Sequence, residues 1–216
     1  WEVPFPVAIG AKNTPLGRQA PTILGVAWGD LFFWDGRAET LEEQAGGPIT
    51  NPEEMNLTFE ELINRLENIP GYRKGGGLAF PNEGITEENI RKAIATYERT
   101  IVPNKSPFDV WLDGDENAVS GSVKRGFAIF NGKGECATCH AGWNFTDNQF
   151  YDIGLPDDDI GRYDIEPDNE QARFAFKTPS LRNLTQRAPF MHDGSVPDIE
   201  AVILHYVSGG LVRPSK

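Results

Sequence analysis

The feature that most constrains this chain is the stretch GECATCHAGW at 134–143, which holds both of its cysteines. Cys136 and Cys139 are separated by two residues, and His140 follows directly. A Cys-x-x-Cys-His run is compatible with a redox pair, with part of a zinc site, or with the attachment of c-type haem. In the third case each thiol bonds one vinyl group, and the adjacent imidazole becomes the proximal ligand of the iron.

The rest of the chain separates these alternatives. Zinc needs about four nitrogen or sulfur ligands, and the only other histidines are His192 and His205, neither at finger-like spacing. A thioredoxin-like pair belongs to a βαβ unit, whereas a helical pattern precedes this motif. The residues therefore favour covalent haem c. Because its attachment takes place outside the cytoplasm, we expect a periplasmic or extracellular protein.

A second axial ligand for the iron has to come from downstream of the motif, where the donors are Met191, His192, His205 and Tyr206. His205 lies one residue off the apolar face of its helix, so we expect it to point to solvent. Tyr206 lies on that face, where a core tyrosine is the alternative. Met191 lies in the loop APFMHDGS, where ordinary packing is the alternative. Methionine would raise the haem potential, and tyrosinate would lower it.

Composition excludes several classes of partner. The net charge is −12 and no basic block is present, which argues against nucleic acid and anionic membranes. No apolar run approaches the roughly 20 residues of a membrane span. With 39% apolar residues, the 216-residue chain can form one large domain or two small ones. The 23 glycines and 16 prolines predict long loops.

The helical patterns predict a mainly α protein. Residues 1–36 are rich in Pro and Gly and are expected to be irregular. Thr40 opens a short helix that we expect to end at Gly46-Gly47-Pro48. Thr58 opens a second helix, which stops before Pro70. No convincing run of strands is present.

Further helices are expected in the remainder of the chain. One starts near Glu87 and has Ile90, Ile94, Tyr97 and Ile101 on one face. Residues 102–107 are the best candidate linker. Another helix, with Val119, Val123, Phe127 and Phe130 on one face, leads into the cysteine motif. A final helix begins near Ser195, has Ile199, Val202, Ile203 and Tyr206 as its apolar face, and closes at Gly209-Gly210.

Three stretches of the chain resemble the bacterial di-haem cytochrome c peroxidase family, which includes the MauG-type enzymes that mature methylamine dehydrogenase. They are residues 17–56, with FFWDGR and NPEEM, residues 126–142, GFAIFNGKGECATCHAG, and residues 176–210, FKTPSLRNLTQRAPFMHDGSVPDIEAVILHYVSGG. The resemblance implies two cytochrome c-like domains. Residues 1–104 would be part of the peroxidatic domain, and residues 105–216 the electron-transfer domain. The family's first Cys-x-x-Cys-His is expected upstream of residue 1, and a further helix is expected after residue 216.

The resemblance also assigns roles to residues. Cys136, Cys139, His140 and Arg182 would bind the relay haem. Trp34 would lie between the two haems as a bridge for electrons, although a tryptophan beside two phenylalanines is also typical of a core. Glu54 matches the distal acid–base residue that moves a proton between the peroxide oxygens, and Gln44 its hydrogen-bonding companion. Without the resemblance, Glu54 reads as a surface carboxylate.

The axial ligand separates two branches of the family. The peroxidases place a methionine where this chain has Tyr206, and the MauG-type enzymes place a tyrosine there. We therefore prefer Tyr206 to Met191 as the distal ligand. A tyrosine ligand favours oxidation of a protein partner over simple peroxide removal.

The family's calcium site fits less well. The family uses an asparagine where this chain has Gln19, and a threonine carbonyl where it has Arg187, whereas Pro189 matches. Calcium binding is therefore doubtful here.

Taken together, these features predict a periplasmic di-haem oxidoreductase that holds one covalent haem c itself and needs a second haem for activity. Its partners would be hydrogen peroxide and a small redox protein or protein substrate, with a homodimer possible. The alternative is a mono-haem electron-transfer cytochrome without peroxidase activity.

Overall fold

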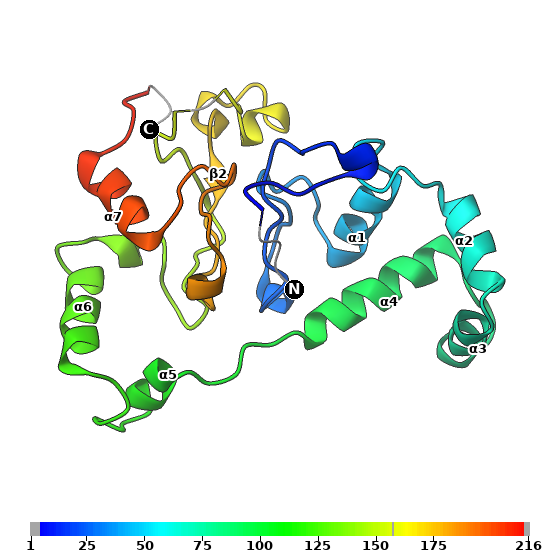
Figure 1. Ribbon diagram of the computed structural model, residues 1–216, viewed down its shortest axis with the longest axis horizontal. Helices are drawn as coiled ribbons and strands as arrows, with labels where there is room; N and C mark the ends of the chain where they lie inside the picture. Colours follow the sequence, from blue (N-terminus) through cyan, green and yellow to red (C-terminus); the bar gives the residue numbers. More distant parts are fainter. Residues whose placement is uncertain (1–4, 157, 214–216) are drawn as a thin grey trace.

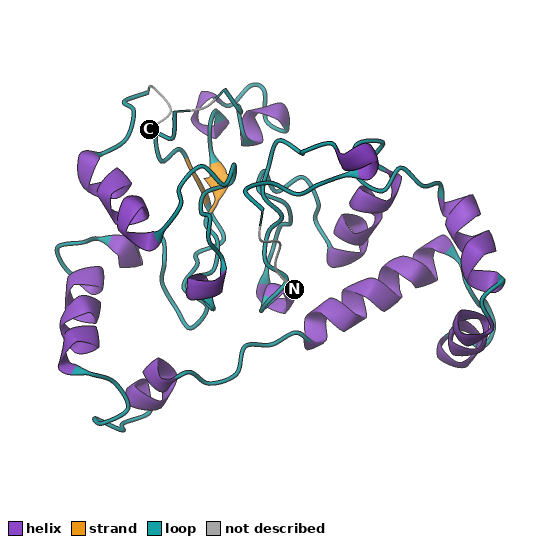
Figure 2. Cartoon of the chain, in the orientation of Figure 1, coloured by secondary structure: helices purple, strands orange, loops and turns teal. Residues whose placement is uncertain are grey.

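The computed structural model describes residues 5–156 and 158–213, and it is mainly α with long loops, as predicted (Figure 2). The helices are α1 (Leu41–Thr50), α2 (Phe59–Glu67), α3 (Pro70–Ala79), α4 (Glu87–Thr100), α5 (Pro107–Leu112), α6 (Gly121–Asn131) and α7 (Ile199–Ser208). Two-residue strands, β1 (Phe150–Tyr151) and β2 (Phe176–Lys177), pair antiparallel. Figure 1 shows α1–α4 at one end, α5–α7 at the other, and irregular segments from both halves between them.

Hydroxyl caps start most of the predicted helices. The side chains of Thr40, Thr58, Thr86 and Ser120 each accept a hydrogen bond from the backbone N–H three residues later, at the start of α1, α2, α4 and α6. Each cap satisfies one of the N–H groups that a helix start leaves without a partner. The predicted helices α2, α4 and α6 are confirmed, except that Ile101 follows the end of α4 and Val119 precedes the Ser120 cap of α6. Residues 101–106 form an irregular segment between α4 and α5.

The predicted end of α1 at Gly46-Gly47-Pro48 is wrong, because the helix continues through Pro48 to Thr50. Packing against α4 explains the difference. A Cβ atom at Gly46 would lie 1.6 Å from the Arg91 guanidinium, so glycine here allows close helix contact rather than ending the helix. Arg91 Nη1 also donates to the Glu42 carbonyl at 3.2 Å.

Two further expectations near helix ends need correction. Helix α3 was not predicted, because its sequence PGYRKGGGLA contains three consecutive glycines, but Pro70 stands in its first turn, where its missing N–H costs nothing. Helix α7 begins at Ile199 rather than near Ser195, because the Asp198 carboxylate caps it by accepting from Ala201 N at 2.8 Å. Its end is as predicted, with Gly209 in the left-handed conformation at φ 82°.

A small core holds α1 and α4 to the N-terminal loop. Its buried members are Phe32, Ala38, Leu41 and Ala95, with Val26 and Phe33 packed against them. The predicted apolar face of α4 is only partly covered, since Tyr97 is 51% exposed. The core therefore fixes the loop around residues 26–38, which carries Trp34, onto the helices.

The segment Trp34–Arg37 joins this loop to the C-terminal half. Gly36 has φ 71°, and a Cβ atom there would lie 2.3 Å from the Phe150 ring, so only glycine fits. Arg37 lies over the Phe33 ring at 3.7 Å. Lys177 N donates to the Trp34 carbonyl at 2.8 Å. The FFWDGR motif is therefore a tight turn fitted against β1 and β2.

An ion-pair cluster strengthens the same junction. Arg18 Nη1 lies 2.5 Å from Asp35 Oδ2, and Arg18 Nε lies 2.6 Å from Asp159 Oδ2. Burial disfavours the charge on Arg18, but the hydrogen bonds that Arg18 donates to both carboxylates more than offset this effect and raise the pKa of Arg18. Arg162 Nη1 adds a bond to the Asp35 carbonyl at 2.8 Å. The two halves are therefore joined by ion pairs and hydrogen bonds in which each charged group has a partner.

Candidate haem and electron-transfer site

The cysteine motif begins directly after α6, in the 3₁₀ turn Cys136–Thr138. Both thiols are free, so they are available to the vinyl groups of haem. The His140 ring is anchored by Nδ1, which lies 2.9 Å from the Phe145 carbonyl oxygen. Burial lowers the pKa of His140 and favours the neutral imidazole. A neutral ring that donates from Nδ1 has its lone pair on Nε2, as a metal-ligating histidine requires. These residues fit haem c.

The two axial candidates lie in different places. Tyr206 is 51% exposed, yet surrounding protein atoms remove enough water from its hydroxyl to raise its pKa, and the Cys139 and Cys136 thiols raise it further. The Tyr206 hydroxyl is therefore within electrostatic range of the cysteine pair. Met191 and Trp34 instead line one cavity together.

His205, which neighbours Tyr206, does not point to solvent, so that expectation is wrong. Its Nε2 lies 2.9 Å from the Ile153 carbonyl oxygen, and the ring is half-buried. A loop from the C-terminal half covers this side of α7, which a helical pattern alone does not reveal.

Arg182, expected at the haem, is held by protein groups. Its Nη1 lies 2.7 Å from Asp109 Oδ2, and its Nε donates to the Trp143 carbonyl at 2.8 Å. The guanidinium holds the pKa of the Asp109 carboxyl well below its usual range. Arg182 thus ties α5 to the loop that follows the cysteine motif.

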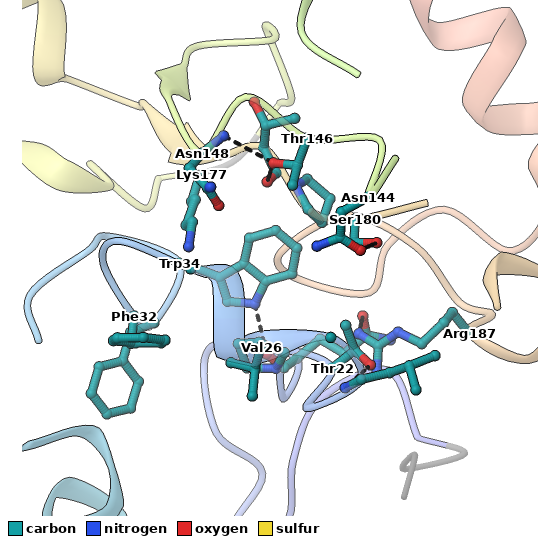
Figure 3. Close-up of a pocket in the computed structure, with 18 of the residues that line it drawn as sticks. Thr22, Val26, Phe32, Trp34, Asn144, Thr146, Asn148, Lys177, Ser180 and Arg187 are labelled. Carbon is teal, nitrogen blue, oxygen red and sulfur yellow. Dashed lines mark hydrogen bonds between the residues drawn. The ribbon is translucent and has the colours of Figure 1, made fainter. Parts of the chain in front are cut away.

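Trp34 lines a cavity of about 140 Å³ to which both halves of the chain contribute (Figure 3). Its Nε1 donates to the Gln19 carbonyl at 2.8 Å. Figure 3 shows Lys177, Asn148 and Thr146 on one side of the indole, and Val26 and Thr22 on the other. Trp34 is therefore a boundary residue between the two halves rather than a core residue of one.

Gln44 and Glu54 lie on and after α1. Gln44, Pro48 and Asn51 follow one another at helical spacing along one strip of the helix. Asn51 ends α1, and its Nδ2 donates to Glu54 Oε2 at 2.9 Å. Both Gln44 and Glu54 are half-buried. The Glu54 carboxylate is thus fixed at the C-terminal end of the helix strip that carries Gln44.

Sequence reasoning missed one residue beside Trp34. His192 was considered only as an iron ligand, but it is 3% exposed and stacks on Phe176, with 3.5 Å between ring centroids. Its ring centroid lies 6.3 Å from that of Trp34. Neither the contact of His192 with Trp34 nor that of Arg18 with Asp159 has a local sequence signal, because each joins residues more than a hundred positions apart.

The family model described as di-haem cytochrome c peroxidase matches residues 2–117. The chain belongs to this family. Members bind c-type haem, in agreement with the free thiols and the anchored histidine described above.

Three known proteins illustrate the relationship. The methylamine utilization protein MauG of Methylorubrum extorquens is 47% identical over all of this chain and 62% of its own length. The cytochrome c peroxidase Ccp of Escherichia coli is 37% identical over 91% of this chain and 43% of its own length. The crystal structure of a MauG-like protein associated with microbial copper homeostasis superposes with a TM-score of 0.88 and 31% identity, over 98% of this chain and 68% of that one.

The chain thus spans about three fifths of the MauG protein that it matches. Both branches considered from the sequence, peroxidase and MauG, are represented among its relatives. Within residues 5–156 and 158–213, no helix is long and apolar enough to cross a membrane.

Proposed function

We propose that this chain forms the electron-relay domain and one wall of the peroxide pocket of a periplasmic di-haem oxidoreductase. The observation that carries the proposal is the arrangement around Trp34. The haem-binding residues lie in the C-terminal half, the Gln44–Glu54 strip lies in the N-terminal half, and Trp34 contacts both halves. A mono-haem cytochrome would not need such a strip.

On the C-terminal side, Cys136 and Cys139 would hold the haem covalently and His140 would be its proximal ligand. Bound there, haem supplies reversible one-electron transfer. The hydrogen bond between His140 and the Phe145 carbonyl orients the imidazole and increases its basicity. Of the two distal candidates, Tyr206 is preferred, because it is within electrostatic range of the cysteine pair whereas Met191 lines the cavity beside Trp34.

On the N-terminal side, Glu54 would act as the acid–base group. A carboxylate can take the proton from one peroxide oxygen and return it to the other as the O–O bond breaks. Asn51 occupies one carboxylate oxygen, Oε2, and so leaves the other free for the substrate. Gln44 would orient the peroxide by hydrogen bonding without adding charge. The second haem, expected outside this chain, would complete the pocket.

Two reactions are compatible with this arrangement. Hydrogen peroxide would be reduced with electrons from a small redox protein, or peroxide would serve as oxidant for a protein partner. A tyrosine ligand favours the second, because tyrosinate lowers the haem potential and stabilises high oxidation states.

The test is haem stoichiometry and peroxide reactivity of the intact native protein. Two covalent haems, together with a peroxide reaction that is lost in Glu54→Gln, are expected. One haem with a reversible one-electron titration and no peroxide reaction would overturn the proposal in favour of the mono-haem cytochrome.

A further inference from the structure

The junction beside Trp34 is closed by direct hydrogen bonds from Gln19 and Arg187. By resemblance, Gln19, Arg187 and Pro189 stand where the family binds calcium between its domains. Gln19 is 4% exposed, and its Nε2 donates to the Pro189 carbonyl at 2.6 Å. A guanidinium nitrogen of Arg187 donates to the Ala20 carbonyl at 3.1 Å and to Gln19 Oε1 at 3.4 Å.

We propose that Gln19 and Arg187 take the place of calcium in this chain, so that the junction is assembled without a metal. Calcium requires six to eight oxygen ligands at about 2.3–2.6 Å. Here the Pro189 carbonyl faces an amide donor, and 2.6 Å between the two heavy atoms leaves no room for an ion. Glutamine is one methylene longer than asparagine, which lets its amide reach the carbonyl directly.

The orientation of the Gln19 amide follows from its two partners. The Pro189 carbonyl can only accept and the Arg187 guanidinium can only donate, so the amide nitrogen must face Pro189 and the amide oxygen must face Arg187. With the amide so placed, Gln19 offers an ion beside Pro189 a donor rather than an oxygen ligand.

The charge at the site also argues against a bound calcium ion. Arg187 is permanently positive, and a calcium ion a few ångströms away would be repelled by it. No cluster of three or more His, Cys, Asp or Glu side chains that could hold a metal occurs in the part of the chain that the structure describes. Among the described residues, the site therefore contains a cation, Arg187, and no cluster of carboxylates that could hold a second one.

The same hydrogen bonds fix the position of Trp34. Gln19 accepts the Trp34 Nε1 hydrogen bond on its carbonyl and donates its own N–H to the His192 carbonyl at 2.6 Å. Its side chain is fixed by Pro189 and Arg187, so Gln19 links the indole to the C-terminal loop. Gln19 and Arg187 are positioning residues for Trp34, and this role does not depend on which reaction the protein catalyses.

The test compares metal binding in the wild-type holoprotein with that in a Gln19→Asn/Arg187→Thr double variant, which restores the family residues. After equilibration with calcium and gel filtration, elemental analysis should find no stoichiometric calcium in the wild type. Its melting temperature should be the same in calcium and in chelator. The double variant should bind about one calcium per chain and melt higher in calcium than in chelator, because a ligand that binds only the folded state stabilises it. Gln186→Asn, an exposed amide on the same loop, is the control and should gain no calcium.

The positioning role has its own readout, the ultraviolet resonance Raman signal of the Trp34 indole N–H, assigned by its absence in Trp34→Phe. The signal should shift in the double variant without calcium and return when calcium is added. A wild type that retains one calcium and loses stability in chelator would overturn the inference. So would a double variant that takes up no calcium yet keeps the wild-type Trp34 signal. Because these measurements need no turnover, they stand apart from any failure of the proposed function.

Discussion

The C-terminal and N-terminal halves of this chain both contribute to the candidate site, but they encode it differently. In the C-terminal half, Cys136, Cys139 and His140 lie within one Cys-x-x-Cys-His run, a local pattern that favours covalent haem c. In the N-terminal half, Gln44 and Glu54 are common residue types ten positions apart, and Glu54 is held at the end of α1 by the Asn51 cap. The difference shows that a haem attachment motif can be recognised from a few neighbouring residues of the sequence. A pair of acid–base residues can be recognised only when the fold shows which groups surround them.

The largest expected effect concerns the Cys-x-x-Cys-His run. In Cys136→Ala/Cys139→Ala, covalent haem should be lost completely, because no thiol remains to bond the vinyl groups. Mass spectrometry of the denatured chain measures this directly, and Met191→Leu should leave the haem mass in place. A wild-type chain that carries no haem mass would contradict the assignment of the motif.

The next prediction addresses the dispersed set. Glu54→Gln should lower the rate of the peroxide reaction by roughly 10²–10⁴-fold, the usual contribution of a positioned acid–base group. Stopped-flow spectroscopy of the holoprotein provides the rate. Glu53→Gln is a matched control, because Glu53 is exposed and its neighbour Glu54 holds the Asn51 contact. Equal losses in both variants would mean that Glu54 has no special role.

A third prediction distinguishes the two axial candidates. Tyr206→Met should raise the potential of the relay haem, within the roughly 0.8 V range that axial ligands span. Tyr206→Phe should remove the tyrosinate signature from the spectrum, and Met191→Leu should change neither. Potentiometric titration followed by absorbance measures both quantities. The reverse pattern would make Met191 the ligand.

The junction between the halves can be tested through stability. Arg18→Met should destabilise the fold by about 1.5–3 kcal/mol, because it removes charged hydrogen bonds to two partly buried carboxylates, of which Asp35 keeps its pair with Arg37. Arg65→Met removes an exposed pair with Glu61 and should cost at most about 1 kcal/mol. Urea denaturation gives both values, and similar costs would show that the Arg18 cluster is no more than a surface contact.

The smallest effect is a pH dependence in the C-terminal half. Arg182 holds the pKa of Asp109 below its ordinary value of 3.8, so the folded protein binds fewer protons there than the unfolded chain. This contribution is present above about pH 4 and is lost as the pH falls further. The unfolding free energy of Asp109→Asn should therefore fall less steeply between about pH 5 and pH 2 than that of the wild type. Parallel curves would show that the pair contributes nothing.

How far the sequence predicted this molecule depends on the range of the interactions involved. Helices with a threonine or serine cap and a regular apolar face, such as α2 and α4, were predicted because their signals lie within a few residues. The course of α1 through Pro48 and the half-buried ring of His205 were not, because each depends on packing against a distant segment. Helix α3 was missed because three consecutive glycines are unfavourable in a helix. The same holds for the candidate site, where the cysteine motif was evident but the Arg18 cluster and the His192 stack were not.

The hydrogen bond from Trp34 Nε1 to the Gln19 carbonyl has a consequence for how charge would pass through the indole. An amide oxygen is too weak a base to keep a proton. In the proposed bridging role, an electron could therefore leave and return while the ring nitrogen stays protonated. Passage between the two halves would then be limited by electron tunnelling alone, and its rate should be the same in heavy and ordinary water.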